Sequence, residues 1–370
     1  MPAFIQAATM GSFLVASAAA SAVPLTSSGT LPMDAVNFAG GLRLTVNGAP
    51  HGQKPQSLLL DTGSSTLAFC DASLAESVRS LQTNYMSCNL YGSGNEGYWG
   101  FFFKGAVTLS GGLELEESYY SIMQQEVSMP CGDGLQGIFG VAFKQLDQAA
   151  NHAQPLNWPS GGVGQCPQPS TDLVGPLMQY LKQDTPQGHL GIYWSGATGS
   201  NEGTLYVGPD AVSNEHYAQG TVQKAQLGEL GYYDVTINSF SFGGQSVSVQ
   251  CDNSGGSSPC LVDTGTPIMM VPYEIYNQMS SGATGKLSIE LAGADGSAVT
   301  LDFDAQTLVN NQYIQASQGG PVILGLPLWA FYYTVFDVKA TTVEFVQHSP
   351  KELEALRVQG EKKREAVVVV

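Results

Sequence analysis

One short motif occurs twice, once in each half of the chain. Residues 58–65 read Leu-Leu-Leu-Asp-Thr-Gly-Ser-Ser, and residues 260–267 read Cys-Leu-Val-Asp-Thr-Gly-Thr-Pro. In both copies, apolar residues that are typical of a buried strand lead into Asp-Thr-Gly and a further hydroxyl residue. A single Asp-Thr-Gly is typical of an ordinary turn. Two copies in the same setting indicate a duplicated architecture in which each half contributes one loop to a pseudo-two-fold axis.

The pattern also indicates a chemistry. A carboxylate at the end of a buried strand is costly unless it is hydrogen-bonded, and the neighbouring hydroxyls and the backbone around Gly63 can supply such bonds. If Asp61 and Asp263 meet, they cannot both ionise easily, and they titrate as a pair. One carboxyl can then take a proton from water while the other gives one to a carbonyl oxygen. This predicts amide hydrolysis without a metal, cofactor or covalent intermediate.

Three further patterns follow the motif in a fixed order, and together they resemble the pepsin-like aspartic proteases from about Phe38 to Val346. They are a flap-like Tyr91-Gly92-Ser93-Gly94, two apolar strands that end in glycine (residues 137–140 and 322–325), and a closing strand (residues 332–337). The resemblance implies an all-β protein with a few short helices. It implies two pseudo-symmetric lobes with a cleft between them.

The expected domains are a signal peptide at residues 1–22, an N-terminal lobe at 34–198, a C-terminal lobe at 199–348 and a charged flexible tail at 349–370. The signal peptide is predicted from a short apolar stretch and a small-residue cleavage site, although no Lys or Arg precedes it. We expect no basic prosegment before the first lobe.

The resemblance also assigns roles to residues of the site. Asp61 and Asp263 are the expected catalytic residues. The resemblance implies that Thr62 and Thr264 form crossed hydrogen bonds that hold the two loops together. The remaining residues around the two carboxyls are expected to orient them; with the threonines they are Thr62, Gly63, Ser64, Thr264, Gly265 and Thr266. The flap and the pocket before the scissile bond are expected to contain Tyr91, Gly92, Ser93, Leu135 and Ile138.

The chain departs from the family pattern at three positions. Ala68 stands where a tryptophan normally meets the flap tyrosine, Pro267 replaces a hydroxyl residue, and Leu326 replaces Asp or Asn. Two functions therefore remain open. The first is an aspartic endopeptidase that cuts between apolar residues at acidic pH. The alternative is a binding or inhibitor protein on the same fold that has lost catalysis.

Charge narrows the range of partners. The 370 residues carry a net charge of −17, and five of the 14 basic residues lie in the last twenty positions. Binding to nucleic acid or to anionic lipid is therefore not expected. The expected partner is a peptide or unfolded protein, and the expected state is a monomer without stable membrane insertion, secreted or in an acidic lysosome-like compartment. The five histidines are scattered, so no metal site is expected.

Six cysteines permit 15 pairings. They could be free thiols of a cytosolic protein, but their positions around loops favour disulfides. The resembled family has a short disulfide loop where Cys251 and Cys260 bracket a Gly/Ser-rich stretch. Sequential pairing is the expectation, which joins Cys70 to Cys88, Cys131 to Cys166 and Cys251 to Cys260.

Two segments of the chain have their own signals. Residues 144–170 are rich in Gln, Pro and Gly and are predicted to be a long surface insertion. Residues 172–182 have apolar residues at helical spacing, which predicts a short helix. A second short helix is predicted at residues 272–279, which begin with a proline, a residue favoured in the first turn of a helix.

Overall fold

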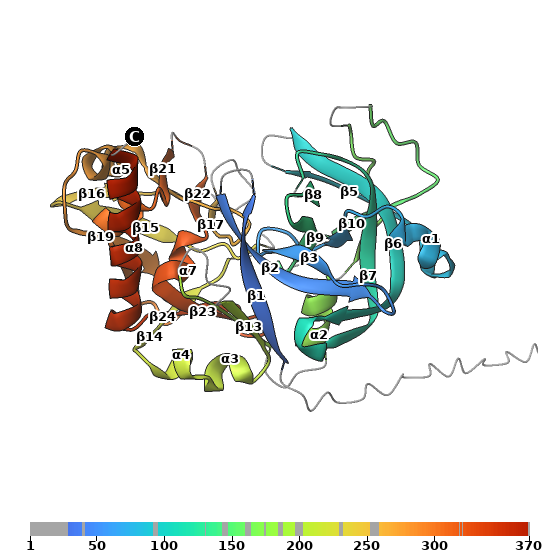
Figure 1. Ribbon diagram of the computed structural model, residues 1–370, viewed down its shortest axis with the longest axis horizontal. Helices are drawn as coiled ribbons and strands as arrows, with labels where there is room; N and C mark the ends of the chain where they lie inside the picture. The colour runs from blue at the N-terminus through green and yellow to red at the C-terminus, as the bar shows by residue number, and fades with distance from the viewer. Residues whose placement is uncertain are drawn as a thin grey trace, which may run out of the picture.

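The computed structural model consists of two halves, built mostly of strands, that lie side by side (Figure 1). The all-β prediction with few short helices is confirmed. The structure describes residues 29–38, 41–91, 95–129, 131–142, 147–159, 164–173, 175–183, 188–196, 203–228, 232–251, 259–317, 319 and 321–368. The predicted signal peptide and the predicted lobe boundary near residue 198 lie outside these residues, so both stay predictions.

One large sheet runs through the molecule, in the order β11-β10-β5-β6-β7-β4-β9-β3-β2-β1-β13-β12-β23-β24-β14, with β8 paired to β9. Its strands in the first half are β1 (Gly29–Phe38), β2 (Gly41–Pro50), β3 (Gln56–Asp61), β4 (Leu67–Phe69), β5 (Gln82–Tyr91), β6 (Glu96–Leu109), β7 (Glu114–Val127), β8 (Cys131–Gly132), β9 (Leu135–Gly140), β10 (Asp147–Asn151) and β11 (Thr171–Leu173). The helical elements there are α1 (Leu74–Ser77), η1 (Arg79–Leu81), η2 (Ser110–Gly112) and α2 (Pro176–Gln183).

The second half continues the large sheet and adds smaller ones. Its strands are β12 (His189–Trp194), β13 (Gly203–Val207), β14 (Val222–Gln226), β15 (Ile237–Phe242), β16 (Gln245–Ser248), β17 (Cys260–Val262), β18 (Met269–Pro272), β19 (Lys286–Ala292), β20 (Ala298–Asp304), β21 (Ile314–Ser317), β22 (Val322–Leu324), β23 (Tyr332–Asp337) and β24 (Thr342–Gln347). Its helices are α3 (Asp210–Ser213), α4 (Glu215–Ala218), α5 (Tyr273–Ser280), α6 (Ala305–Asn310), α7 (Pro327–Phe331) and α8 (Pro350–Val368).

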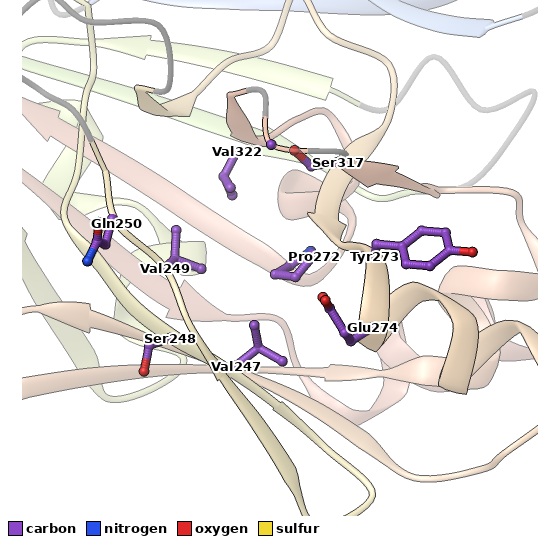
Figure 2. A pocket seen from close by; sticks show the side chains of 10 residues that line it. Val247, Ser248, Val249, Gln250, Pro272, Tyr273, Glu274, Ser317 and Val322 are labelled. Carbon is purple, nitrogen blue, oxygen red and sulfur yellow. The ribbon is translucent and has the colours of Figure 1, made fainter.

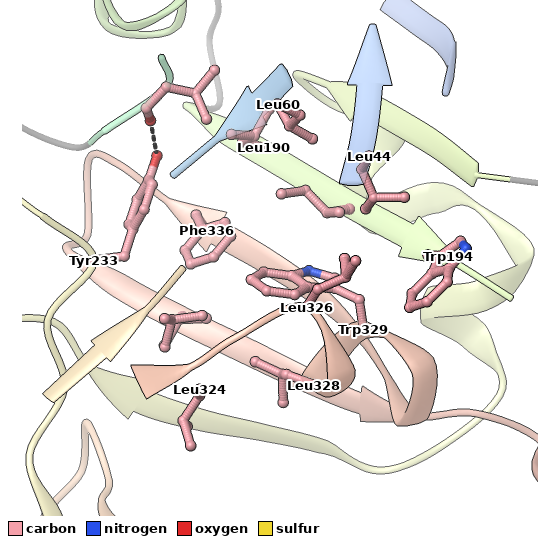
Figure 3. Close-up of a cluster of buried hydrophobic side chains, with 14 of the residues drawn as sticks. Leu44, Leu60, Leu190, Trp194, Tyr233, Leu324, Leu326, Leu328, Trp329 and Phe336 are labelled. Atoms are coloured by element: carbon pink, nitrogen blue, oxygen red, sulfur yellow. Dashed lines mark hydrogen bonds between the residues drawn. The ribbon is translucent and has the colours of Figure 1, made fainter. Parts of the chain in front are cut away.

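The hydrophobic core is continuous between the two halves. Figure 3 shows Leu44 and Leu60 of the first half close to Trp329 and Phe336 of the second, and all four side chains are fully buried. The Tyr233 hydroxyl donates a hydrogen bond of 2.7 Å across this boundary to the carbonyl of Val141. Because apolar burial contributes about 25 cal/mol per Å², this shared core holds the two halves together and fixes the loops that approach one another above it.

Two of the three predicted disulfides are wrong. The structure joins Cys70 to Cys131 and Cys88 to Cys166, whereas the predicted pair Cys251–Cys260 is confirmed. Strand pairing explains the first difference. The backbone N–H of Cys70 donates to the carbonyl of Gln136, and Cys131 pairs with the same Gln136 across β8 and β9. Strand β9 therefore brings together two cysteines that lie 61 residues apart.

The second difference comes from the predicted surface insertion. Its residues 147–151 form strand β10, which pairs with β5, the strand that carries Cys88. Ala149 and Ala150 are buried, so this part of the segment belongs to the core. The return of the chain after β10 brings Cys166 to Cys88 at a Cα–Cα distance of 5.4 Å. Nothing in the local sequence encodes this long-range strand pairing.

The helix predictions are largely right, and the segment predicted to be a charged flexible tail is helical in the structure. The helix predicted at 272–279 is α5, and the one predicted at 172–182 begins later, at Pro176 of α2, after strand β11. The tail forms α8, in which Leu356 is buried and Glu352 accepts a 2.8 Å hydrogen bond from Tyr193. Across the described chain, no helix combines the length and the hydrophobicity needed to cross a membrane.

A buried histidine near α8 makes stability depend on pH. The Nε2 atom of His348 lies 2.8 Å from the carbonyl of Trp329 and 3.1 Å from that of Trp194. Carbonyls only accept, so Nε2 carries the proton of a neutral ring. Burial lowers the pKa of His348, and the Trp329 carbonyl and the Glu352 charge oppose this without reversing it.

The contribution of His348 to stability should therefore fall as pH drops below about 6.5, because the histidine of the unfolded chain takes up a proton that the folded one does not. The slope from this group is at most about 1.4 kcal/mol per pH unit. We expect His348→Gln, whose amide can still donate to the carbonyls, to flatten the dependence of urea unfolding between about pH 7 and 5. His152→Gln, at an exposed histidine, is the matched control. Equal slopes for His348→Gln and wild type would contradict the prediction.

Candidate active site

Each Asp-Thr-Gly motif follows a short strand that pairs in parallel with a second strand. Asp61 ends β3, which runs parallel to β9, with Asp61 opposite Gly140. Asp263 follows β17, which runs parallel to β22, and its backbone N–H donates to Leu324 O at 3.0 Å. Both halves present their aspartate in the same way, as the repeated motif predicts.

The glycines that end the two apolar-Gly strands are required by close packing. A Cβ atom on Gly140 would lie 2.6 Å from Thr66 N, and one on Gly325 would lie 1.9 Å from Ile268 O. The backbone that follows each aspartate thus passes directly over a glycine of the neighbouring strand. This close contact fixes the position of each Asp loop relative to the neighbouring strand.

The two loops are tied together by crossed hydrogen bonds. The N–H of Thr62 donates to Thr264 Oγ1 at 3.0 Å, and the N–H of Thr264 donates to Thr62 Oγ1 at 2.9 Å. Each threonine hydroxyl in turn donates to a carbonyl of the opposite half, Val262 O at 2.9 Å and Leu60 O at 2.7 Å. Both threonines are fully buried, so these bonds hold the two aspartates in register.

The hydrogen bonds to the carboxyls repeat in both halves. Asp61 Oδ1 accepts from the N–H of Gly63 at 2.8 Å, and Asp61 Oδ2 accepts from the Ser64 hydroxyl at 2.6 Å. In the other half, Asp263 Oδ1 accepts from the N–H of Gly265 at 2.8 Å, and Asp263 Oδ2 accepts from the Thr266 hydroxyl at 2.6 Å. One oxygen of each carboxyl is therefore held by backbone and the other by a hydroxyl.

The two carboxyls lie next to each other. A Cβ on Gly63 would be 2.8 Å from Asp263 Oδ1 and 3.1 Å from Asp61 Oδ1, and a Cβ on Gly265 would be similarly close to both. Asp61 is only 7% exposed. Burial first, and then the charge of Asp263, raise the pKa of Asp61 to about 7, although its bonds from Ser64 and Gly63 lower it. The arrangement can hold one proton at mildly acidic pH.

The predicted flap corresponds to the hairpin of β5 and β6, in which Tyr91 pairs with Glu96. Gly92 and Ser93, the other predicted flap residues, lie outside the described residues. The Tyr91 ring stacks on Tyr98, with centroids 6.4 Å apart. Tyr98 belongs to the same buried cluster as Ala68, which stands where the resembled family has a tryptophan. An aromatic ring from β6 thus lies beneath Tyr91.

A hydrogen-bonded link joins this hairpin to the first Asp loop. Asn89 Nδ2 lies 2.7 Å from the Tyr98 hydroxyl and 3.3 Å from Thr66 Oγ1. Asn89 and Tyr98 are not predictable from local sequence, because neither belongs to a local motif and their contact follows from the pairing of β5 with β6.

Of the two predicted pocket residues, the structure brings one into the cluster beneath the flap. Ile138 is buried with Ala68, Tyr98 and Met123, and Tyr91 packs against the same cluster. Leu135 is buried at the start of β9 but is not among the side chains of that cluster. The pocket role of both residues stays a prediction.

Two further side chains near the carboxyls were not foreseen. Tyr232 is half-buried, and its pKa is raised by burial and then by the charges of Asp61 and Asp263. Arg43, on β2, is also half-buried, and Asp263, Asp61 and Glu96 act on its charge. No sequence motif places either residue near the carboxyls. Arg43 lies in an alternating pattern that predicts only a half-buried strand.

A separate pocket lies on the second half, with a volume of about 710 Å³. Figure 2 shows Val249, Pro272, Tyr273 and Glu274 among its lining side chains, which come from α5, the end of β18 and the segment after β16. Neither Asp61 nor Asp263 lines it. Within the described residues, no three His, Cys, Asp or Glu side chains gather as ligands for a metal ion.

Comparison with known proteins agrees with this geometry. A family model described as eukaryotic aspartyl protease matches residues 48–348. Among solved structures, the crystal structure of aspartic proteinase from Irpex lacteus superposes with a TM-score of 0.61 at 19% identity, over 87% of this chain and 98% of that one. No relative was found among curated proteins. At that identity the solved structure supports the fold alone.

Proposed function

Since the chain belongs to the eukaryotic aspartyl protease family, we propose that it is an endopeptidase in which Asp61 and Asp263 together activate water. The observation that carries the proposal is the symmetric hydrogen bonding of the two carboxyls. In each half, a backbone N–H holds one oxygen and a hydroxyl holds the other. Residues Thr62, Gly63, Ser64, Thr264, Gly265 and Thr266 are proposed to keep the pair in this geometry.

The proposed reaction uses one proton that the pair shares. The ionised carboxyl takes a proton from a water molecule, whose oxygen attacks the carbonyl carbon of the peptide, and the protonated carboxyl gives its proton to the carbonyl oxygen. The tetrahedral intermediate then breaks its C–N bond. The leaving nitrogen receives the proton that came from water, and a hydroxyl of the intermediate returns one, so the pair ends in its starting state.

The proposed substrate is an extended peptide or unfolded protein with apolar side chains next to the cut. The cluster beneath Tyr91 is apolar, and it includes Ile138 and Met123. Burying a large apolar side chain against such a surface contributes about 1.5–3 kcal/mol. Leu135 is proposed to extend this surface at the start of β9. Among the departures from the family pattern, Leu326 is buried in the shared core next to Trp329 (Figure 3).

We expect the rate of cleavage to have a bell-shaped dependence on pH with an acidic maximum. At low pH both carboxyls are protonated and no base remains; at high pH both are charged and no acid remains. The alkaline limb should lie near the pKa of Asp61, which is about 7. The measurement is kcat/KM on an unfolded protein substrate from about pH 2 to 8, with and without a pepstatin-like transition-state analogue.

The same assay separates the protease from the alternative function. Cleavage that the analogue blocks supports the protease. If no cleavage occurs at any pH, while the protein still binds a peptide, the chain is a binding or inhibitor protein. Pro267 favours that alternative, because it places neither a hydroxyl nor an N–H beside the Asp263 loop.

The setting proposed for this activity is the secretory pathway, either outside the cell or in an acidic lysosome-like compartment. Three disulfides support it, since such bonds persist in oxidising environments. A monomer with lobes at residues 34–198 and 199–348 is proposed as the working form.

A further inference from the structure

Arg43 lies against the loop that carries Asp263. A Cβ atom on Gly41 would be 2.7 Å from Arg43 Nη1 and 3.0 Å from Pro267 Cβ. Pro267 follows Asp263 by four positions in the sequence. The guanidinium and this proline therefore flank the same point, and Gly41 between them has no side chain to separate them. Both Gly41 and Arg43 are only half-buried, so solvent reaches this place.

The guanidinium faces acidic groups from two sides. Asp263 and Asp61 act on it from the two Asp loops, and Glu96 acts from the first residue of β6, next to the turn of the flap hairpin. The charge of Arg43 is thus close enough to both Asp loops and to the flap hairpin to be affected by their acidic groups. A peptide that reaches the carboxyls must enter the same space.

Arg43 has no carboxylate within salt-bridge distance in the part of the chain that the structure describes. Within the described residues, its side chain donates one hydrogen bond, of 3.0 Å, from Nη1 to the carbonyl of its neighbour Leu42. Burial lowers the pKa of Arg43, but a guanidinium stays charged in proteins. A half-buried cation with spare donors is costly, and here it persists in a chain whose net charge is −17.

We propose that Arg43 binds a carboxylate of the peptide substrate, supplied by an Asp or Glu side chain a few residues from the cut. The inference rests on the proposed peptidase function and adds an acidic residue to the apolar ones next to the scissile bond. Guanidinium and carboxylate match in a bidentate geometry. Pro267 has neither a hydroxyl nor an N–H with which to bind the substrate, so in this proposal Arg43 makes the polar contact with the substrate beside the Asp263 loop.

The site makes selectivity depend on pH. A glutamate side chain is ionised above about pH 4.3, whereas the active pair keeps its proton up to the pKa of Asp61 at about 7. Between these limits the enzyme is active and the substrate carboxylate is charged. Among the described residues, Asp61, Asp263 and Glu96 are the ionisable groups whose charges act on Arg43, and a substrate carboxylate must be attracted to the guanidinium in their presence.

The test uses pairs of peptides with one cleavable apolar bond, in which Glu or Gln is placed at each of three positions on either side of that bond. For the full chain near pH 5.5, we expect the Glu peptide to be preferred at one position by about ten- to a hundredfold in kcat/KM, the range of a hydrogen bond to a charged group. Near pH 3 the preference should vanish, because glutamate is then protonated.

Three variants are compared with the wild type. Arg43→Met should remove the preference while Gln peptides are still cleaved, and Arg43→Lys should keep part of it, because lysine retains the charge without the bidentate fork. Arg79→Met is the matched control, since Arg79 is exposed and pairs with Glu76. Loss of the preference in Arg79→Met would assign it to overall charge and overturn the proposal.

The remaining outcomes also decide. Equal cleavage of Glu and Gln peptides by the wild type, or a preference that survives in Arg43→Met, overturns the role of Arg43 and leaves the peptidase function intact. If no peptide is cleaved, the peptidase function fails, and the dissociation constants of the same peptide pairs then test Arg43. Tighter binding of the Glu peptide to the wild type but not to Arg43→Met supports the site, and equal binding overturns it.

Discussion

Asp61→Asn is expected to abolish peptide hydrolysis while the protein keeps its fold, and Asp263→Asn is expected to do the same. An amide has the shape of a carboxyl, but it can neither hold the shared proton nor take one from water. General acid and general base each contribute about 10²–10⁴ in rate, so kcat/KM should fall by at least about 10⁴-fold in each variant. The double variant should be no slower, because the pair works as one unit.

Although Asp61→Asn is expected to lose activity, it should be no less stable than the wild type at neutral pH. The pKa of Asp61 in the folded protein, about 7, lies above its unfolded value. Between these two values the folded state holds a proton that the unfolded state has released, so the contribution of this group to stability falls as pH rises. Asp61→Asn removes the buried acid, and its thermal midpoint at pH 7 should be at least that of the wild type. The wild type should approach the variant at acidic pH.

Asp71→Asn is the matched control for the activity measurement. Asp71 is exposed and, like Asp61, accepts hydrogen bonds from a neighbouring serine and backbone N–H, in this case of Ser73. Peptide hydrolysis by Asp71→Asn should have the same kcat/KM as hydrolysis by the wild type. The proposed mechanism is wrong if either active-site variant retains near-wild-type cleavage. It is also unsupported if Asp71→Asn loses activity to a similar extent.

The sequence could predict the features that local motifs carry. The two Asp-Thr-Gly loops, the glycines that end their partner strands and the hydroxyls of Ser64 and Thr266 all lie within a few residues of a strand end. At such positions the backbone leaves few conformations, so residue type and spacing suffice. The repeat adds a second constraint, because two loops that share the same Asp-Thr-Gly sequence are expected to meet symmetrically if they meet at all.

The features that the sequence could not predict depend on which distant strands pair. Cys166 reaches Cys88 only because β10 pairs with β5. Asn89 meets Tyr98 only through the register of β5 and β6. Arg43 lies beside the Asp263 loop because β2 belongs to the sheet that runs between the halves. In each case the contact joins residues whose separation along the chain gives no periodic signal.

The helical tail shows the same limit for a different reason. The segment after Val346 is highly charged, and charge of this kind is typical of exposed or disordered chain. Its helix is stabilised by a few contacts with the body: Leu356 is buried, and Glu352 accepts a hydrogen bond from Tyr193. Helix formation here depends on the docking surface, which the tail sequence does not contain.

The second large effect is expected from the disulfide that crosses the first half. Cys88 and Cys166 are 78 residues apart, whereas Cys251 and Cys260 are 9 apart. A disulfide stabilises mainly by restricting the unfolded chain, and more so for a longer loop. Removing Cys88–Cys166 by a double change to serine should therefore cost about 4.5 kcal/mol, and removing Cys251–Cys260 in the same way should cost about 2.5 kcal/mol. Urea unfolding of the oxidised proteins measures both.

The single variant Cys88→Ser tests the pairing itself. If Cys88 is bonded to Cys166, its removal frees the thiol of Cys166, and thiol labelling followed by peptide mapping should modify that residue and leave Cys70 unlabelled. Labelled Cys70 would instead indicate the sequential pairing, which closes a much shorter loop. The unfolding experiment tests the effect of the bond separately from its pairing. If removing Cys88–Cys166 costs no more stability than removing Cys251–Cys260, then β10 and β5 are held together without the bond. In that case the packing of Ala149 and Ala150, and not the restriction of the unfolded chain, would account for the stability of this part of the sheet.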